Sequence, residues 1–219
     1  MRNTLYVINP NSNRAVTAGL DVAVAPLRLA GGPRIECVTL DDGPPGVQTQ
    51  LDVDSAALGV HRFAMSHQDS AAGFVVACFS DPGLHLLRET AGVPVFGISE
   101  CGVLTALTLG QTFGVIAILN GSIPRHLRTW GAMGLNARFA GELAIGRTVA
   151  ELADQPATLA AMIAVGKRLR DERGAHVLVM GCAGMASFRD QLQDATGLPD
   201  VEPTQAACAM AIGRLQLGW

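Results

Sequence analysis

The stretch Phe74–Leu84, with the sequence FVVACFSDPGL, determines how the rest of the chain is interpreted. Its first residues are apolar and rich in β-branched side chains, and a tight Asp-Pro-Gly turn follows them. This pattern predicts a buried strand that carries Cys78 at its carboxyl end. The stretch Val177–Met185 (VLVMGCAGM) repeats the arrangement later in the chain and carries Cys182. Two cysteines at the carboxyl ends of two such strands form a symmetric pair.

Helical and strand-like segments alternate along the whole chain, an order typical of parallel α/β folds. A first strand, Leu5–Asn9, ends in an Asn-Pro-Asn turn, and Ser12 is the expected N-cap of the helix that follows. The pattern restarts with the strand Phe113–Leu119, which runs into Asn120-Gly121-Ser122 in the same way. In each half the strand that carries the cysteine is third in line, so we infer a duplicated unit.

The sequence therefore predicts an α/β fold of two pseudo-symmetric doubly wound lobes, each with a parallel sheet. We expect the first lobe to comprise residues 1–99 and 205–219 and the second to comprise residues 100–204. Parallel sheets bind ligands outside the carboxyl ends of their strands, so the active site is expected in the cleft between the lobes. Asn9, Asn120 and the two cysteines would all face that cleft.

The composition and the N-terminal sequence predict a soluble cytoplasmic protein, and the expected cleft predicts a small-molecule substrate. The chain has 219 residues, is 49% hydrophobic and carries a net charge of −3, which leaves no basic surface for nucleic acid. The N-terminus passes into strand-like sequence without a signal peptide, and the most apolar stretch, residues 103–119, is broken by Gly110 and Gly114. No membrane span is therefore expected. The five cysteines lack CxxC spacing and are expected to be reduced.

The two strand-end cysteines indicate acid–base chemistry at carbon. A turn and a helix are expected after each of them, and helix amides lower the pKa of a nearby thiol, so both Cys78 and Cys182 are expected to form thiolates readily. Facing each other across a cleft, one would remove a proton from a carbon acid and the other would return a proton to the opposite face. Ala183 and Gly184 are small enough for backbone N–H groups to approach the resulting anion.

Other kinds of site find little support in the sequence. The five histidines form no HxxxH or HxH pair, so no metal site is expected and they are interpreted as surface or capping residues: His61, His67, His85, His126 and His176. The chain lacks GxGxxG, GxxxxGK[ST] and GxSxG motifs, and no cofactor is expected. The loop over residues 41–50 is expected to lie beside the site and to move when ligand binds.

Five blocks of the chain resemble the aspartate/glutamate racemase superfamily, and most closely its hydantoin and allantoin racemase branch. They occur in the expected order and span nearly the whole chain; the two cysteine blocks are the most specific. The blocks are LYVINPNS (5–12), ACFSDPGL (77–84), RE (88–89), PVFGISE (94–100) and GCAGM (181–185).

The resemblance implies a racemase that uses two bases and no cofactor, acting on 5-substituted hydantoins, allantoin or related amino-acid derivatives, and we expect a homo-oligomer. It makes Cys78 and Cys182 the catalytic pair. The implied substrate-binding residues are Asn9, Asn11, Gln48, Phe79, Ser80, Ile118, Ala183 and Gly184.

Two positions depart from the family pattern. Many hydantoin racemases have a Thr-Thr pair where this chain has Ala117-Ile118, which makes the pocket more apolar, and the loop around Gln48 lacks an acidic residue followed by glycine.

Two other functions are compatible with the sequence. Within the superfamily, maleate isomerases use both cysteine positions. Arylmalonate decarboxylases resemble a one-cysteine design that keeps only the second position, so the presence of Cys78 argues against that branch. A protein that binds a metabolite without catalysis is the third hypothesis, and the replaced Thr pair is its main motivation.

Overall fold

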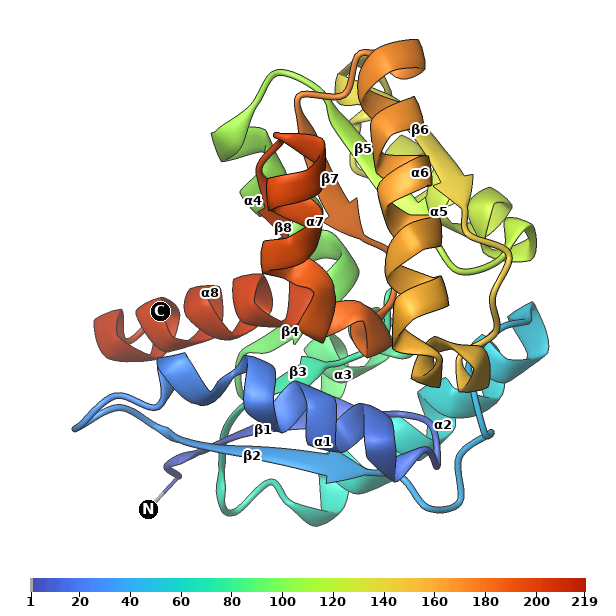
Figure 1. The fold of residues 1–219 in the computed structure, drawn as a ribbon. Helices are drawn as coiled ribbons and strands as arrows, with labels where there is room; N and C mark the ends of the chain where they lie inside the picture. Colours follow the sequence, from blue (N-terminus) through green and yellow to red (C-terminus); the bar gives the residue numbers. More distant parts are fainter. Residues whose placement is uncertain (1) are drawn as a thin grey trace.

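A computed structural model describes residues 2–219, and two four-stranded parallel sheets organise these residues (Figure 1). Met1, the first residue of the predicted first lobe, lies outside this range. The strands are β1 (Thr4–Asn9), β2 (Arg34–Thr39), β3 (Ala71–Val76), β4 (Val95–Gly97), β5 (Phe113–Ala117), β6 (Phe139–Ala144), β7 (Val177–Met180) and β8 (Asp200–Val201).

The two sheets repeat one topology. The first has the strand order β2-β1-β3-β4 and the second the order β6-β5-β7-β8, and all neighbouring strands run parallel. Each strand of the first half therefore has a counterpart four strands later. The predicted α/β fold of two lobes with parallel sheets is confirmed.

Helices cover both sheets, as the parallel arrangement requires. The α-helices are α1 (Arg14–Ala23), α2 (Gln50–Ser66), α3 (Leu84–Thr90), α4 (Ile98–Leu109), α5 (Ile123–Ala132), α6 (Gln155–Arg173), α7 (Arg189–Thr196) and α8 (Pro203–Leu217). Short 3₁₀ helices lie between them: η1 (Ala25–Leu27), η2 (Asn120–Ser122), η3 (Asn136–Arg138), η4 (Ala150–Ala153) and η5 (Ala183–Phe188). Within residues 2–219, no helix combines the length and apolar character that crossing a membrane requires.

Helices α4 and α8 connect the two halves. Helix α4 follows β4 of the first sheet but packs against β7 and β8 of the second. Helix α8 follows β8 yet packs against β3 and β4 of the first sheet, and the two helices lie against each other (Figure 1). The predicted lobe boundaries, with residues 100–204 in one lobe and residues 205–219 returned to the other, stay a prediction.

One hydrophobic core extends through both lobes. Alternate residues of β1 point to opposite faces of its sheet. Leu5 and Val7 belong to a large buried cluster that also contains Val115 and Val177 from the second sheet. Tyr6 and its neighbours on the other face form a separate cluster under α2 and α3. The shared core places the carboxyl ends of the two sets of strands next to each other.

The first helix begins one residue later than predicted. Asn13, and not Ser12, is the N-cap of α1, and its side chain accepts a hydrogen bond from the N–H of Ala15 at 3.0 Å. The side-chain oxygen of Asn11 accepts from the N–H of Asn13 at 2.9 Å and holds the preceding turn. The N-cap is therefore Asn13 in place of Ser12, and α1 begins at Arg14.

Candidate active site

The two strand-end cysteines line one cavity between the lobes. Cys78 lies two residues beyond β3, and Cys182 lies two residues beyond β7 and directly before η5. Both are partly buried and both are free thiols. The cavity has a volume of about 30 Å³, which is room for about two water molecules. We therefore expect the cleft to open when a larger ligand binds.

Most of the predicted binding residues also line this cavity. They come from the ends of β1, β3, β5 and β7 and from the loop before α2, where parallel α/β sheets hold their ligands. The residues predicted from the sequence that lie in the cavity wall are Asn11, Gln48, Phe79, Ser80, Ile118, Ala183 and Gly184. Gln48 belongs to the loop that was expected to cover the site.

Asn9 is the exception, because it lies behind the cavity wall. Its side chain is fully buried, and its Nδ2 group donates to the side chains of Asn11 at 3.1 Å and Thr17 at 3.0 Å and to the carbonyl of Asn13 at 3.1 Å. Its Oδ1 atom accepts from the backbone N–H of Asn11 at 3.2 Å. In this structure Asn9 therefore orients Asn11, and Asn11 reaches the cavity.

Asn120 does not face the cleft, which corrects the expectation from the sequence. It starts η2 and is exposed to solvent. Strand β5 ends at Ala117 and its extension continues through Ile118 and Leu119, which line the cavity instead. The chain turns outward only afterwards, so the resemblance between the two Asn turns is local and does not extend to the site.

The expected low thiol pKa is wrong for both cavity cysteines. Burial raises the pKa of Cys78 to about 12 and that of Cys182 to about 11. The backbone N–H of Ser80 lowers the pKa of Cys78 and that of Gly184 lowers the pKa of Cys182, but one amide hydrogen bond does not offset the lost hydration. Each thiol has a single amide partner because an irregular turn or a 3₁₀ helix, and not an α-helix, follows it.

The turn after Cys78 is held by a buried carboxyl group. Asp81 has a positive φ of 43° and accepts hydrogen bonds from the N–H groups of Ser99 at 3.0 Å and Glu100 at 2.9 Å, at the start of α4. Burial raises the pKa of Asp81 to about 7. A Cβ atom at Gly97 would lie 2.3 Å from this carboxyl group, so only glycine fits there. These hydrogen bonds connect the turn that follows Cys78 to helix α4, which leads into the second lobe.

Arg125 lines the cavity although no pattern in the sequence indicates it. It lies on α5 and donates from Nη2 to the carbonyl of Gln48 at 2.9 Å and from Nη1 to the carbonyl of Gly121 at 3.0 Å. The hydrogen bond to Gln48 joins α5, in the second half of the chain, to the loop over residues 41–50 in the first half. The positive charge of Arg125 also lowers the pKa of Cys78 against the effect of burial. A single arginine in an amphipathic helix carries no sequence signal for this role.

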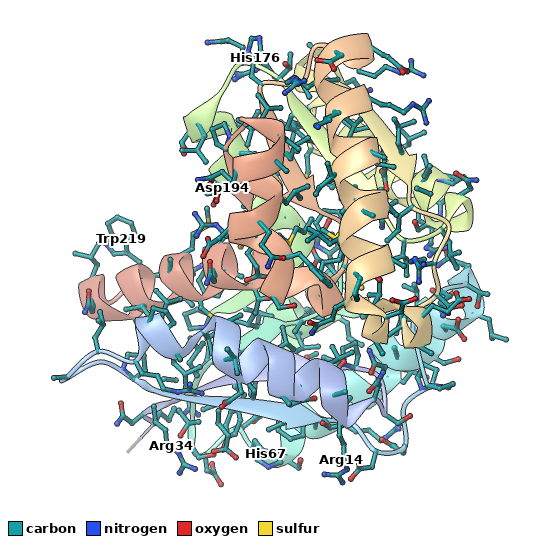
Figure 2. The ribbon with its side chains drawn as sticks, in the orientation of Figure 1. Arg14, Arg34, His67, His176, Asp194 and Trp219 are labelled. Atoms are coloured by element: carbon teal, nitrogen blue, oxygen red, sulfur yellow. The ribbon has the colours of Figure 1, made fainter. Side chains whose placement is uncertain are left out.

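His126 was interpreted as a surface or capping residue, and this is wrong. Its side chain is 3% exposed, and its Nδ1 atom lies 2.6 Å from Oε1 of Glu142, whose side chain is fully buried. Its Nε2 atom lies 3.5 Å from the hydroxyl of Ser80. In contrast, His67 caps the end of α2 and His176 is exposed; the two lie at opposite ends of the molecule (Figure 2).

The donor groups around the cavity do not form a metal centre. Within residues 2–219, no group of three or more His, Cys, Asp or Glu side chains is arranged to hold a metal ion. The cavity wall instead combines two thiols with hydrogen-bonding groups from Asn11, Ser80 and Arg125 and with apolar side chains. Such a wall is suited to proton transfer at a small, largely uncharged organic ligand.

Comparisons with known proteins define the class. The family model for Asp/Glu/Hydantoin racemases matches residues 5–211. The chain is 33% identical to the hydantoin racemase of Rhizobium meliloti over 98% of its own length and 90% of that protein, and 31% identical to the hydantoin racemase of Paenarthrobacter aurescens over 98% and 92%. The crystal structure of allantoin racemase from Pseudomonas fluorescens superposes with a TM-score of 0.92 at 28% identity, covering 98% of this chain and 92% of that one.

The chain therefore belongs to the Asp/Glu/Hydantoin racemase family, whose racemases are isomerases. The resemblance noted in the sequence is confirmed, and so is the prediction that the protein is an isomerase. A more distant structure, the glutamate racemase RacE1 of Bacillus anthracis, has a TM-score of 0.75 at 16% identity and shows that the two-lobed fold is shared more widely.

Proposed function

We propose that this protein is a cofactor-independent racemase of a hydantoin-like substrate, with Cys78 and Cys182 as its acid and base. The observation that carries the proposal is that two cysteines from equivalent positions in the two halves line one small cavity. The named relatives add that 5-substituted hydantoins and allantoin are the substrates to test first.

The reaction needs one thiolate and one thiol. The thiolate takes the proton from the stereocentre, the bonding electron pair moves onto the adjacent carbonyl, and the opposite thiol then gives its proton to the other face. The product is the mirror image of the substrate, and the two cysteines have exchanged protonation states. No proton is gained or lost overall, and the two cysteines carry out both proton transfers without a cofactor.

The raised thiol pKa values suit this chemistry. A carbon acid beside a carbonyl holds its proton tightly, and a thiolate whose pKa lies near 11 or 12 is a stronger base than an ordinary one. Negative charge on Cys182 raises the pKa of Cys78, so ionisation of one cysteine disfavours ionisation of the other. Arg125 favours the charge on Cys78. Burial thus lowers the amount of thiolate but increases its basicity.

The proposal is tested by proton NMR in D₂O with single enantiomers of allantoin, several 5-substituted hydantoins, aspartate and glutamate. We expect deuterium at the stereocentre and loss of optical rotation for at least one cyclic ureide. Cys78→Ala and Cys182→Ala should abolish racemisation, whereas Cys37→Ala, a half-buried cysteine outside the cavity, should not. Exchange with none of the compounds would refute the proposal and favour a metabolite-binding protein. The lobe boundaries, the homo-oligomeric state and the cytoplasmic location stay predictions.

A further inference from the structure

A buried hydrogen-bonded chain runs from β6 to the cavity. Glu142 on β6 contacts Nδ1 of His126 on α5 at 2.6 Å, and Nε2 of the same ring faces the hydroxyl of Ser80 at 3.5 Å. Ser80 and His126 line the cavity next to Cys78, whereas Glu142 lies behind it. Phe79 packs its ring edge-to-face on His126, with centroids 5.2 Å apart, and fixes the plane of the imidazole.

Glu142 determines which nitrogen of His126 carries the proton. A carboxylate only accepts hydrogen bonds, so the short contact places the proton on Nδ1. In the neutral ring Nε2 is then an acceptor, and the hydroxyl of Ser80 donates to it. The Ser80 oxygen then keeps lone pairs free to accept a hydrogen bond, and Ser80 lines the cavity. Oε2 of Glu142 has no partner among the described residues, so no second contact competes for this carboxylate.

We infer that His126 and Glu142 are positioning residues that turn the Ser80 hydroxyl into an acceptor for an N–H group beside the substrate's stereocentre. The inference rests on the proposed function and specifies its substrate further. In a hydantoin, N1–H is bonded to the carbon that loses its proton, next to where the thiols act. The site therefore selects cyclic ureides with a free N–H at this position over their N-alkylated analogues.

The test compares one 5-substituted hydantoin with its N1-methyl and N3-methyl derivatives. Racemisation is measured as kcat/KM for wild type, Glu142→Gln, Ser80→Ala and the double variant. Glu172→Gln, at an exposed carboxylate on α6, is the matched control. Glu142→Gln keeps almost the size of the native side chain. Any steric clash between the N1-methyl group and the cavity is therefore the same in this variant as in wild type. The proton position on His126 is read separately from ¹⁵N NMR of its ring.

We expect wild type and the control to prefer N1–H over N1-methyl by about 10–100-fold, since a buried acceptor without its donor is costly. The preference for N1–H over N1-methyl should fall about tenfold in Ser80→Ala, whereas the ratio of kcat/KM between the parent and the N3-methyl compound, which both keep N1–H, should change little. Glu142→Gln should lose the same preference, because its amide N–H can donate to Nδ1 and thereby move the ring proton to Nε2. In the Ser80→Ala background, Glu142→Gln should add nothing further, because one residue acts through the other.

Three results would overturn the inference. They are a proton on Nε2 in the wild type, a wild-type N1–H preference retained in Ser80→Ala, and additive effects in the double variant. A failure of the proposed function is a separate result: no cyclic ureide would then exchange in any protein. The ring tautomer in the ligand-free protein would still decide whether Glu142 controls His126.

Discussion

The buried carboxyl group of Asp200 should make the protein less stable as the pH rises. Asp200 lies on β8, its residue is 3% exposed, and neither side-chain oxygen has a hydrogen-bond partner among residues 2–219. Burial raises its pKa from 3.8 to about 8, although the positive charge of Arg189 opposes this rise; the nearby charge of Glu202 adds to it. The folded protein therefore keeps a proton that the unfolded chain has already released above pH 4.

The sign and size of the effect follow from this difference. A group whose pKa is higher in the folded state stabilises the fold fully below its unfolded pKa, and the contribution is lost as the pH rises through the folded value. The loss approaches about 1.4 kcal/mol per pH unit, so Asp200 should cost about 2–3 kcal/mol of unfolding free energy between pH 5 and pH 7. For a chain of this size, each kcal/mol corresponds to about 2–4 °C in Tm.

Asp200→Asn removes the titration while keeping the shape of the side chain. Urea unfolding at pH 5, 6, 7 and 8, followed by circular dichroism, should show the variant gaining stability relative to wild type as the pH rises. Asp190→Asn, at an exposed carboxylate on α7, should run parallel to wild type. If Asp200→Asn also runs parallel to wild type over the whole range, the group is not buried as a neutral acid and the reasoning fails.

Three further predictions follow from the geometry of the site. In the ligand-free protein both cavity thiols should react slowly with iodoacetamide at pH 7, and the alkylation rate should keep rising up to pH 9 without reaching a plateau. A rate that levels off near neutral pH would contradict the raised pKa values. Arg125→Gln should slow alkylation of Cys78 at a given pH, because it removes the charge that lowers that pKa; an unchanged rate would exclude this role. Gly97→Ala should cost about 2–4 kcal/mol in urea unfolding because its Cβ would collide with the Asp81 carboxyl, whereas Gly121→Ala, which meets nothing within 4 Å, should be close to neutral.

The features predictable from the sequence are those that short-range patterns encode. Apolar runs ending in turn residues predicted the strands that carry Cys78 and Cys182, and their repetition predicted two equivalent sheets. Because parallel strands end at the same edge of a sheet, the two thiols could be placed in one cleft before any contact was known. The packing of α4 and α8 against opposite sheets follows the same repeat.

The missed features depend on tertiary contacts. His126 and Glu142 are 16 positions apart on a helix and a strand, and nothing in either segment indicates that they form a buried pair. The sequence predicts too low a thiol pKa because helix amides are a local property, whereas burial depends on the whole fold. The two Asn turns have similar sequences, but of the two asparagines only Asn9 is enclosed by neighbouring polar side chains, while Asn120 lies at the surface.

The central claim is that two thiols on opposite faces of the substrate share the proton transfer. The most direct measurement is the position of deuterium during early turnover of a single enantiomer in D₂O, with the two enantiomers separated by chiral chromatography and analysed by mass spectrometry. A two-thiol mechanism predicts deuterium in the newly formed enantiomer while the remaining substrate keeps its proton. Equal labelling of both enantiomers from the start would mean that one base serves both faces, and would contradict the account.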